Sequence, residues 1–212
     1  METMTRRERQ RLNTIAELVA AAHKIVKDEG YEALTIRKLA ESVGMATMSV
    51  YSYFADKQAI LTALANDTFE TLARSIRERE PADPMDALRF GLRRFAAFGF
   101  ENPNEFRTIF MTPKLHEHAD VTVEEIAASN PAYQGLLRAV KIAIDAGALN
   151  GDAHAMATIL WTVTHGAISL SLTFPLYPFG DADAYVGRLI DMTVDALATK
   201  TVEPLSGAPD CC

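Results

Sequence analysis

Residues 35–54 read TIRKLAESVGMATMSVYSYF and carry two short sets of apolar side chains on either side of a glycine. Thr35 stands directly before the first set and is a typical N-cap, because its hydroxyl accepts a hydrogen bond from the first turn of a helix. Gly44 lies between the sets, where glycine adopts the left-handed backbone of a tight turn without strain. The apolar positions, spaced as on one helix face, are Ile36, Leu39, Ala40 and Val43, then Val50, Tyr51 and Phe54. The stretch predicts a helix-turn-helix.

Helical spacing continues on both sides of this stretch. Upstream, the apolar positions between Ile15 and Val26 predict a helix over residues 11–29 that Gly30 ends. Downstream, further helices are expected over about residues 56–80, 84–99, 102–110, 121–128, 133–144, 152–172 and 182–200. No segment of useful length alternates with period two. We therefore expect an all-α protein of about nine helices, with an N-terminal three-helix helix-turn-helix domain and a C-terminal helical domain.

Charge and composition suggest where these domains divide. The net charge is −7, but residues 1–57 hold nine Lys and Arg against eight Asp and Glu, whereas the remainder holds twelve against twenty. Arg6, Arg7, Arg9 and Arg11 concentrate the positive charge near the N-terminus, although a charge cluster is usually a solvated face. We expect the helix-turn-helix domain at residues 1–57, a connecting helix at about 56–80, a second domain at 81–202 and a flexible tail at 203–212.

Several classes of protein are disfavoured by what the sequence contains. Cys211 and Cys212 are adjacent, so they form neither a disulfide framework nor a spaced zinc site, and a reducing cytoplasmic setting is expected. The N-terminus lacks the apolar core of a secretory signal. Residues 153–180 carry no Asp, Glu, Lys or Arg, but His, Ser and Thr interrupt them and prolines end them, which disfavours a membrane span.

An enzyme is the main competing class. His116 and His118, with Glu117 and Asp120, suggest a metal site only weakly, because they lie in an expected loop without ligands on supporting helices. The sequence holds no nucleophile elbow, P-loop or glycine-rich dinucleotide fingerprint. The sequence therefore favours a protein with no catalytic residues, no metal site and no cofactor.

The helix-turn-helix carries the functional hypothesis. Its second helix displays small and aromatic hydroxyl residues with almost no charge. It is also short, as a DNA-binding helix-turn-helix needs for the N-terminal part of this helix to reach base edges. Helical hairpins are common, so spacing alone also allows a helical ligand-binding or interaction protein whose helix-turn-helix reads no DNA.

The stretch and its continuation resemble the tetracycline-repressor (TetR) family of bacterial regulators. The residues that carry the resemblance are Thr35, Leu39, Ala40, Val43, Gly44, Tyr51, Tyr53, Phe54 and Lys57. The sequence departs from the family pattern at Ala46, often Ser, and at Met48, often Gly. The resemblance implies a cytoplasmic bacterial transcription regulator, usually a repressor, released from a palindromic DNA operator by a small hydrophobic effector.

The resemblance also implies DNA-contacting roles for individual residues. Tyr51, Tyr53 and Lys57 would contact phosphates, while packing of the two tyrosines against the first helix remains the alternative. Arg37 would suit guanine, and the methyl groups of Thr47 and Met48 would suit thymine. The complete expected DNA-binding set is Thr35, Arg37, Thr47, Met48, Ser49, Tyr51, Ser52, Tyr53 and Lys57.

In the C-terminal part, Trp161, His165 and Gly166 resemble the Trp-His-Gly signature of one TetR subgroup, which implies a ligand-accepting domain. His165 would be a polar contact in a pocket or, equally well, a core histidine beside a close-packing Gly166. The expected ligand-binding set is Phe98, Phe106, Phe110, Tyr133, Trp161, His165 and Phe174, within a wider group that adds Phe95, Met111 and Tyr177. Plain core packing is the alternative for each of them.

The last two expected helices, about 152–172 and 182–200, are apolar around most of their circumference. Such helices must be covered on two sides. A second subunit would supply the cover as a four-helix bundle across a two-fold axis, whereas a wholly buried helix in a monomer is the alternative. We expect a homodimer through these helices.

Overall fold

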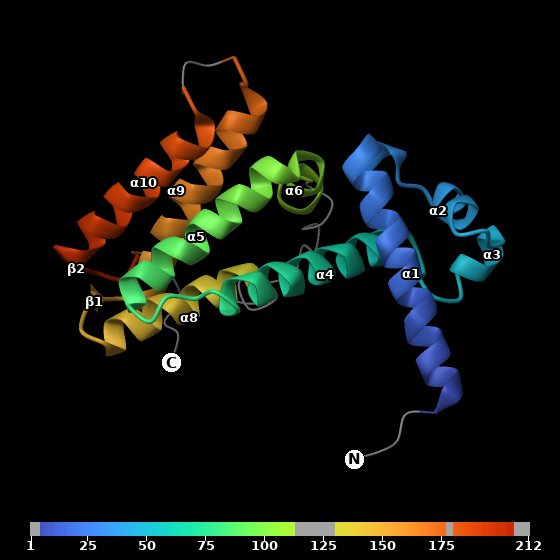
Figure 1. Ribbon diagram of the computed structural model, residues 1–212, viewed down its shortest axis with the longest axis horizontal. Coiled ribbons are helices and arrows are strands. Elements are labelled where there is room, and N and C mark those ends of the chain that lie inside the picture. The colour runs from blue at the N-terminus through green and yellow to red at the C-terminus, as the bar shows by residue number, and fades with distance from the viewer. Residues whose placement is uncertain (1–4, 113–129, 177–179, 206–212) are drawn as a thin grey trace. The chain divides into compact units, whose positions relative to one another are not determined.

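The computed structural model describes residues 5–112, 130–176 and 180–205. Within these ranges it contains nine α-helices, a short 3-10 turn and two strands of two residues each, which confirms the all-α class (Figure 1). The elements are α1 (Arg6–Glu29), η1 (Tyr31–Ala33), α2 (Ile36–Ser42), α3 (Thr47–Val50), α4 (Lys57–Arg77), α5 (Pro84–Glu101), α6 (Pro103–Phe110), α8 (Pro131–Asp145), β1 (Asn150–Gly151), α9 (Ala153–Thr173), α10 (Ala182–Ala198) and β2 (Thr201–Val202). The helix expected at 121–128 and the end of the tail fall outside the described residues.

The chain divides into two compact units. The N-terminal unit comprises α1, η1, α2, α3, α6 and the part of α4 up to Thr68. The C-terminal unit comprises the rest of α4, together with α5, α8, α9, α10 and the two strands. Thus α6, expected in the second domain, groups with the N-terminal unit, and α4 supplies residues to both units.

Helix α1 begins earlier than the apolar pattern indicates. Thr5 caps it by accepting a hydrogen bond from the Glu8 backbone at 3.2 Å, and the Glu8 carboxylate accepts one from the Thr5 backbone at 2.7 Å. This capping box satisfies backbone donors that a helix start otherwise leaves open. The hydrogen bond from the Thr5 backbone also lowers the pKa of Glu8. The cap therefore extends α1 toward its arginine-rich end.

The N-terminal unit is built around one buried face of α1, which packs against η1, α2 and α6. Leu18, Ala22 and Val26 on this face have no exposed surface. Phe106 of α6 and Leu39 of α2 are likewise fully buried. Burial of each large side chain contributes about 1.5 to 3 kcal/mol, so this apolar contact is what holds the short helices in place.

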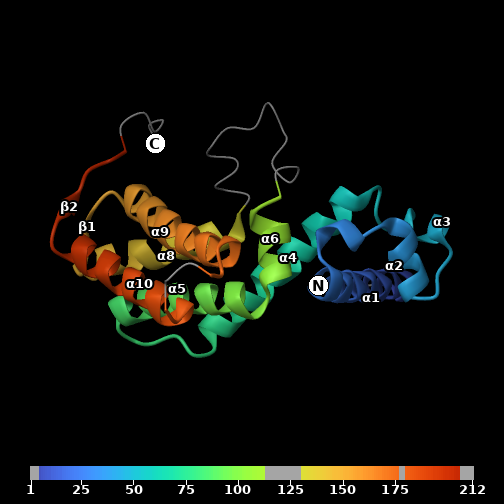
Figure 2. The same ribbon diagram turned by 90° about the horizontal axis from the view of Figure 1, so that it is seen from above.

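The C-terminal unit is a group of four helices, in which α5 contacts α8, α9 and α10, and α9 contacts α8 and α10 (Figure 2). Among the described residues, α9 alone is long and apolar enough to cross a membrane. Its packing against α5, α8 and α10 gives another reason for its apolar character, since a helix enclosed by neighbours needs no polar face.

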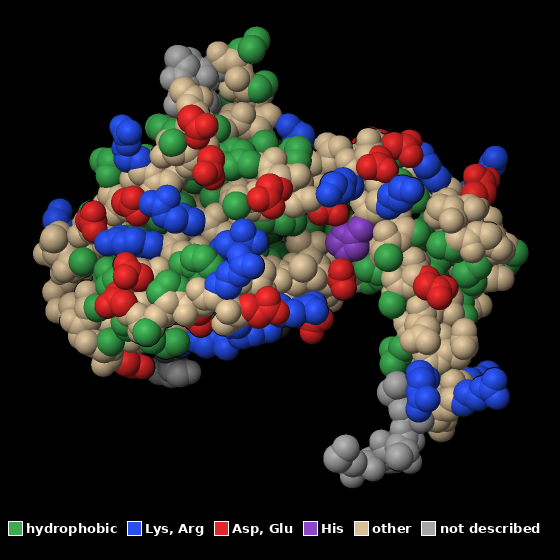
Figure 3. All heavy atoms as spheres, in the orientation of Figure 1, with side chains coloured by type: hydrophobic (Ala, Val, Ile, Leu, Met, Phe, Trp, Pro, Cys, Tyr) green, Lys and Arg blue, Asp and Glu red, His purple; other side chains and the backbone are tan. Residues whose placement is uncertain are grey.

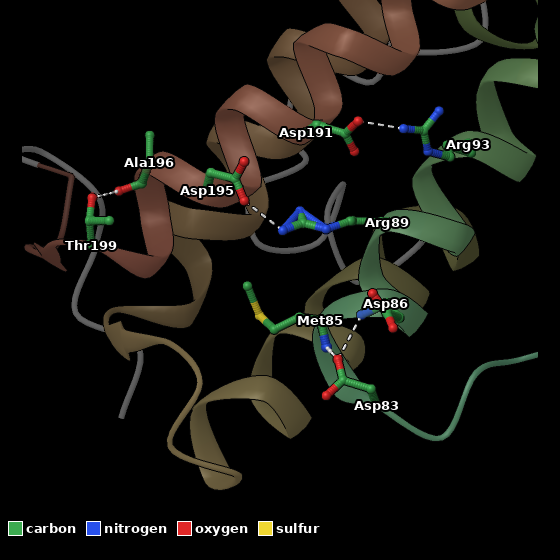
Figure 4. Close-up of polar contacts among 9 residues, drawn as sticks. All are labelled: Asp83, Met85, Asp86, Arg89, Arg93, Asp191, Asp195, Ala196 and Thr199. Atoms are coloured by element: carbon green, nitrogen blue, oxygen red, sulfur yellow. Dashed lines mark hydrogen bonds and ion pairs between the residues drawn. The ribbon is translucent and has the colours of Figure 1, made fainter.

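Two ion pairs join α5 to α10 in this unit. Arg89 lies 2.6 Å from Asp195 and Arg93 lies 2.6 Å from Asp191 (Figure 4). Gly187, one turn before Asp191, leaves room for the Arg93 side chain, because a Cβ there would lie 2.5 Å from an Arg93 guanidinium nitrogen. The small residue and the acidic residue together fix where Arg93 crosses α10.

The ends of this helical group are tied by a short parallel pair. Asn150 pairs with Thr201 and Gly151 with Val202. Gly151 has a φ of 127°, and a Cβ at this position would lie 2.2 Å from the Val202 carbonyl oxygen. Only glycine allows this close approach, so the pair depends on residue 151.

Candidate nucleic-acid interface and ligand pocket

The helix-turn-helix forms where the sequence predicts it. The Thr35 hydroxyl accepts a hydrogen bond from the Lys38 backbone at 3.1 Å and caps α2. Gly44 has a φ of 69°, and the next backbone N–H, at Met45, donates to the Ala40 carbonyl at 2.9 Å. These contacts close the turn and place α3 directly after it.

The expected groove-facing residues lie together on α3 and the turn that follows it. Thr47, Met48 and Ser52 are exposed, and Met48 reaches 77% exposure. Ser49 is half-buried. Val50 between them is fully buried, so it anchors the helix from beneath. The arrangement presents a continuous surface of hydroxyl and methyl groups to solvent.

Arg37, on α2, is 82% exposed but has a partner on its own helix. Its Nε donates to the Glu41 carboxylate at 2.9 Å, and this hydrogen bond raises the pKa of Arg37. Contact with guanine would require the guanidinium to turn its remaining donors outward or to leave Glu41. Glu41 is therefore a competitor for the expected base contact.

One arginine of the N-terminal cluster is tied to the turn after α3. Arg11 donates to the Ser52 carbonyl at 3.0 Å, and its guanidinium lies 5.3 Å from the centroid of the Tyr53 ring. Tyr53 is half-buried, whereas Tyr51 is 48% exposed. The two tyrosines thus differ: Tyr53 is partly engaged with Arg11 of α1, and Tyr51 is the more exposed of the two. Figure 3 shows Lys and Arg side chains at the N-terminal end of α1.

Lys57 has a position that the sequence did not reveal. Its Nζ donates to the Tyr31 carbonyl at 2.9 Å and lies 3.7 Å from the centroid of the Tyr31 ring. The ammonium group therefore joins the start of α4 to η1. The contact holds the ammonium group at the junction of η1 and α4.

A polar cluster joins three helices of the N-terminal unit. His23 of α1 lies with Nδ1 2.9 Å from Glu105 Oε1 of α6 and with Nε2 3.0 Å from Asp67 Oδ2 of α4. Burial lowers the pKa of His23, but the carboxylates of Glu105 and Asp67 outweigh it and raise the pKa above its ordinary value. Asn104 also donates to the Lys27 carbonyl at 3.0 Å. Together these contacts attach α6 to α1.

The C-terminal unit contains a cavity of about 230 Å³. Its walls come from the last turns of α4, from α5, from α8 and from Trp161 of α9. The lining is mostly apolar; its larger members include Phe69, Leu72, Leu88, Leu92, Phe95 and Trp161. A mostly apolar cavity with a few polar groups is the usual form of a small-molecule site.

Only some of the expected ligand-binding aromatics lie at or around Trp161. Trp161 lines the cavity, with Phe95 stacked on it at 5.2 Å, Tyr133 at 6.2 Å and His165 at 5.9 Å between ring centroids. Phe98, on α5, is half-buried and does not line the cavity. The remaining expected residues lie elsewhere: Phe106 and Phe110 contact each other with tilted rings, 4.9 Å between centroids, within α6 of the N-terminal unit, and Phe174 is 53% exposed after α9.

His165 and Gly166 do not form the close-packed pair that was considered. Gly166 is exposed, and a Cβ added to it would meet no described atom within 4 Å, so the close-packing interpretation is wrong within a single chain. Burial lowers the pKa of His165. The ring of His165 stacks on that of Trp161.

No group of three or more His, Cys, Asp or Glu side chains in the described ranges is placed to hold a metal ion. The weak metal site suggested by His116, Glu117, His118 and Asp120 is not tested by this result, because these four residues lie outside those ranges.

The chain matches two families of known proteins. Residues 18–64 match the family described as bacterial regulatory proteins, tetR family. Residues 88–193 match the tetracyclin repressor-like C-terminal domain. The second match spans half of the chain and follows the first along the sequence.

Individual relatives agree with these matches. The transcriptional regulator TtgR of Pseudomonas putida is 26% identical over 204 residues, covering 89% of this chain and 96% of TtgR. The transcriptional repressor AcnR of Corynebacterium efficiens is 28% identical over 74 residues, which cover 35% of this chain but only 39% of AcnR. Likeness to AcnR is therefore confined to one part of each protein.

Solved structures share the fold. A TetR transcription regulator from Haloarcula marismortui has a TM-score of 0.71 at 20% identity, covering 88% of this chain and 98% of its own. RolR in complex with resorcinol has a TM-score of 0.67 at 18% identity, covering 91% and 96%. With the helix-turn-helix in place and both parts of the family matched, the chain belongs to the tetR family and is a DNA-binding transcriptional regulator.

Proposed function

We propose that this regulator is a repressor that binds a palindromic operator as a homodimer and leaves it when a small hydrophobic effector occupies the cavity beside Trp161. The observation that carries the proposal is the exposed surface of α3 in a chain of the tetR family.

In the proposed complex α3 enters the major groove. Thr47 and Met48 contact thymine methyl groups, Ser49 and Ser52 supply hydroxyls, and Arg37 reaches guanine after leaving Glu41. Tyr51, Tyr53 and Lys57 contact phosphates and fix the register, while Thr35 orients α2. Exposure of Met48 and Tyr51 supports these roles.

The proposed dimer forms through α9 and α10. These helices and the residues just after α9 keep large apolar side chains in solvent: Leu170 is 45% exposed, Phe174 53% and Met192 61%. A second copy of the same surface would bury them across a two-fold axis. The two α3 helices must then lie about 34 to 36 Å apart to enter successive major grooves.

The proposed effector acts through α4. Asp67 of this helix faces His23 in the N-terminal unit, and Phe69, only two residues further, lines the cavity in the C-terminal unit. An effector that moves the end of α4 would therefore disturb the contacts that hold α1 and α6. Ligand and operator would favour different conformers and weaken each other's binding. RolR, which has the same fold, holds the small molecule resorcinol, and this supports a ligand of modest size.

We also infer that the chain acts by binding, without catalysis, in the bacterial cytoplasm. The support is the family: its matched relatives are transcriptional regulators. An interaction protein with a helix-turn-helix that reads no DNA remains the competing function.

Selection of genomic fragments by the full chain, followed by footprinting in rising salt, tests the proposal. A repressor of this kind should recover palindromic sites and protect two half-sites one helical turn apart. The interaction protein should recover none. Repression is tested separately, by transcription from a selected site with and without the protein.

A further inference from the structure

The cavity in the C-terminal unit has two cationic groups among its lining residues. Arg77 stands in the last turn of α4 and Arg138 in α8, and both side chains are exposed at the cavity. Neither guanidinium has a hydrogen-bond or ion-pair partner among the described residues. By contrast, Arg89 and Arg93 of the same unit are committed to carboxylates of α10 (Figure 4).

The net charge of the C-terminal unit is negative, so two positive side chains at one cavity stand in contrast to their surroundings. Residues 69–101 and 119–212 hold ten Lys and Arg against seventeen Asp and Glu, so the general field of the unit repels anions. One carboxylate, that of Glu80, also lines the cavity and is exposed. The lining therefore carries two positive charges against one negative, and any preference for an anion must come from Arg77 and Arg138.

The apolar part of the cavity limits the size of a ligand. Its volume is about 230 Å³, and an apolar cavity of about 150 Å³ is known to hold benzene. Phe69, Phe95 and Trp161 contribute aromatic walls, which favour ring-to-ring contact. The space suits one aromatic ring with a short substituent.

We propose that the effector is a small aromatic carboxylate, with its ring against Phe95 and Trp161 and its carboxylate at the mouth of the cavity between Arg77 and Arg138. The planar guanidinium fork matches the two oxygens of a carboxylate. This inference rests on the proposed function, because it assigns a ligand class to the proposed effector site.

The test uses Trp161, the chain's only tryptophan, as the reporter. The probes are 3-phenylpropanoate and its neutral amide, 3-phenylpropanamide, which share a ring and a chain length. Quenching of Trp161, checked by calorimetry, should show that the carboxylate binds the full chain about tenfold more tightly than the amide. The preference should shrink as salt is raised, because the arginines are exposed.

Three variants locate the preference. In the double variant Arg77→Gln and Arg138→Gln, the carboxylate should lose about tenfold in affinity while the amide binds as before. The matched control Glu80→Gln removes the one lining carboxylate and should leave the preference intact or increase it. Arg94→Gln, a change on the same unit away from the cavity lining, should change neither affinity.

Three results would overturn the inference. The first two are equal binding of acid and amide to the unaltered chain, and a preference that survives loss of both arginines. The third is the absence of binding by both probes, because the cavity would then not accept this ligand class. Operator binding by the same preparations, measured without any probe, reports on the proposed function separately. If one of these results is obtained while operator binding is intact, the proposed ligand class is rejected and the proposed repressor function is not.

Discussion

The two units place their functional residues in opposite ways. In the N-terminal unit six of the nine expected contact residues lie between Thr47 and Tyr53, and most of these six are exposed. In the C-terminal unit the cavity draws on positions from Phe69 to Trp161, contributed by four helices and mostly apolar. The first surface follows from a local motif, whereas the second exists only after helices distant in sequence have packed. The residues of the DNA-binding surface can therefore be predicted from the sequence, whereas the residues that line the cavity cannot.

The difference also indicates which changes should damage one unit and spare the other. Helix α4 is the element that contributes to both, with Asp67 in the polar cluster and Phe69 in the cavity. Variants placed on only one side of this helix should separate operator binding from effector binding.

The largest effect is expected from disruption of the dimer. Leu170→Glu combined with Met192→Glu would place charges on the proposed interface. Operator affinity should fall by on the order of a hundredfold or more, because the two subunits would no longer bind the operator together. Analytical ultracentrifugation should show a folded monomer. Leu12→Glu, which alters a leucine of similar exposure in the N-terminal unit, is the control for oligomeric state. A double variant that stays dimeric would place the interface elsewhere.

Filling the cavity should abolish the ligand response without touching the DNA surface. Gly91 lines the cavity, and a Cβ there would meet nothing within 4 Å. Gly91→Leu should weaken effector binding by at least about tenfold through steric overlap, while operator affinity stays unchanged. Gly91→Ala adds one methyl group and serves as the control. Unchanged ligand response in Gly91→Leu would show that the effector binds at another site.

Lys57 tests whether a residue of the DNA surface also serves the fold. Lys57→Ala should reduce operator affinity about tenfold and reduce the salt slope by about one, as expected for a lost phosphate contact. Affinity measured by fluorescence anisotropy across a salt series gives both values. If the slope is unchanged while affinity falls, Lys57 acts only by holding η1 through the Tyr31 carbonyl.

The His23 cluster predicts a pH dependence confined to the N-terminal unit. Its raised pKa means that protonated His23 contributes stability fully below the unfolded value of 6.5, and that this stability is lost as pH rises through the higher folded value. Hydrogen exchange at α1 and α6, corrected for intrinsic rates, should therefore be slower at pH 6 than at pH 8. His23→Gln should remove this difference, and His154→Gln, on an exposed residue of the other unit, should preserve it. Faster exchange at the lower pH would contradict the assignment.

The smallest effect concerns the start of α3. Ala46 precedes this helix and provides no side-chain cap. Ala46→Ser should stabilise the N-terminal unit by about 0.5 to 1 kcal/mol, because a serine hydroxyl accepts a backbone hydrogen bond there. Urea unfolding followed by circular dichroism measures the gain. A loss of stability would mean that α3 begins differently from the arrangement described.

Much of the N-terminal unit could be predicted from the sequence because its determinants are local. Thr35 caps α2 and Gly44 forms the turn, as their types and spacing predict. The contacts of His23, Arg11 and Lys57 could not be predicted, since their partners lie 26 to 82 residues away. No local pattern encodes such distances.

The cavity was predicted only in part for the same reason. Aromatic character identified Trp161, but it also selected Phe106, which is fully buried in α6, and Phe174, which is exposed. Leucine, alanine and glycine supply most of the remaining wall, and their presence in a helix does not distinguish a cavity from core. The presence of Arg77 and Arg138 at one cavity could not be predicted either, because it depends on α4 and α8 packing around the same space.

The central claim is that the exposed α3 surface reads a specific operator. Its most direct test is the affinity of the full chain for a selected palindrome and for a scrambled duplex of the same length and composition, measured at physiological salt. We predict at least about a thousandfold preference for the palindrome, within the range of specific regulators. Equal affinity for the two duplexes would contradict the account.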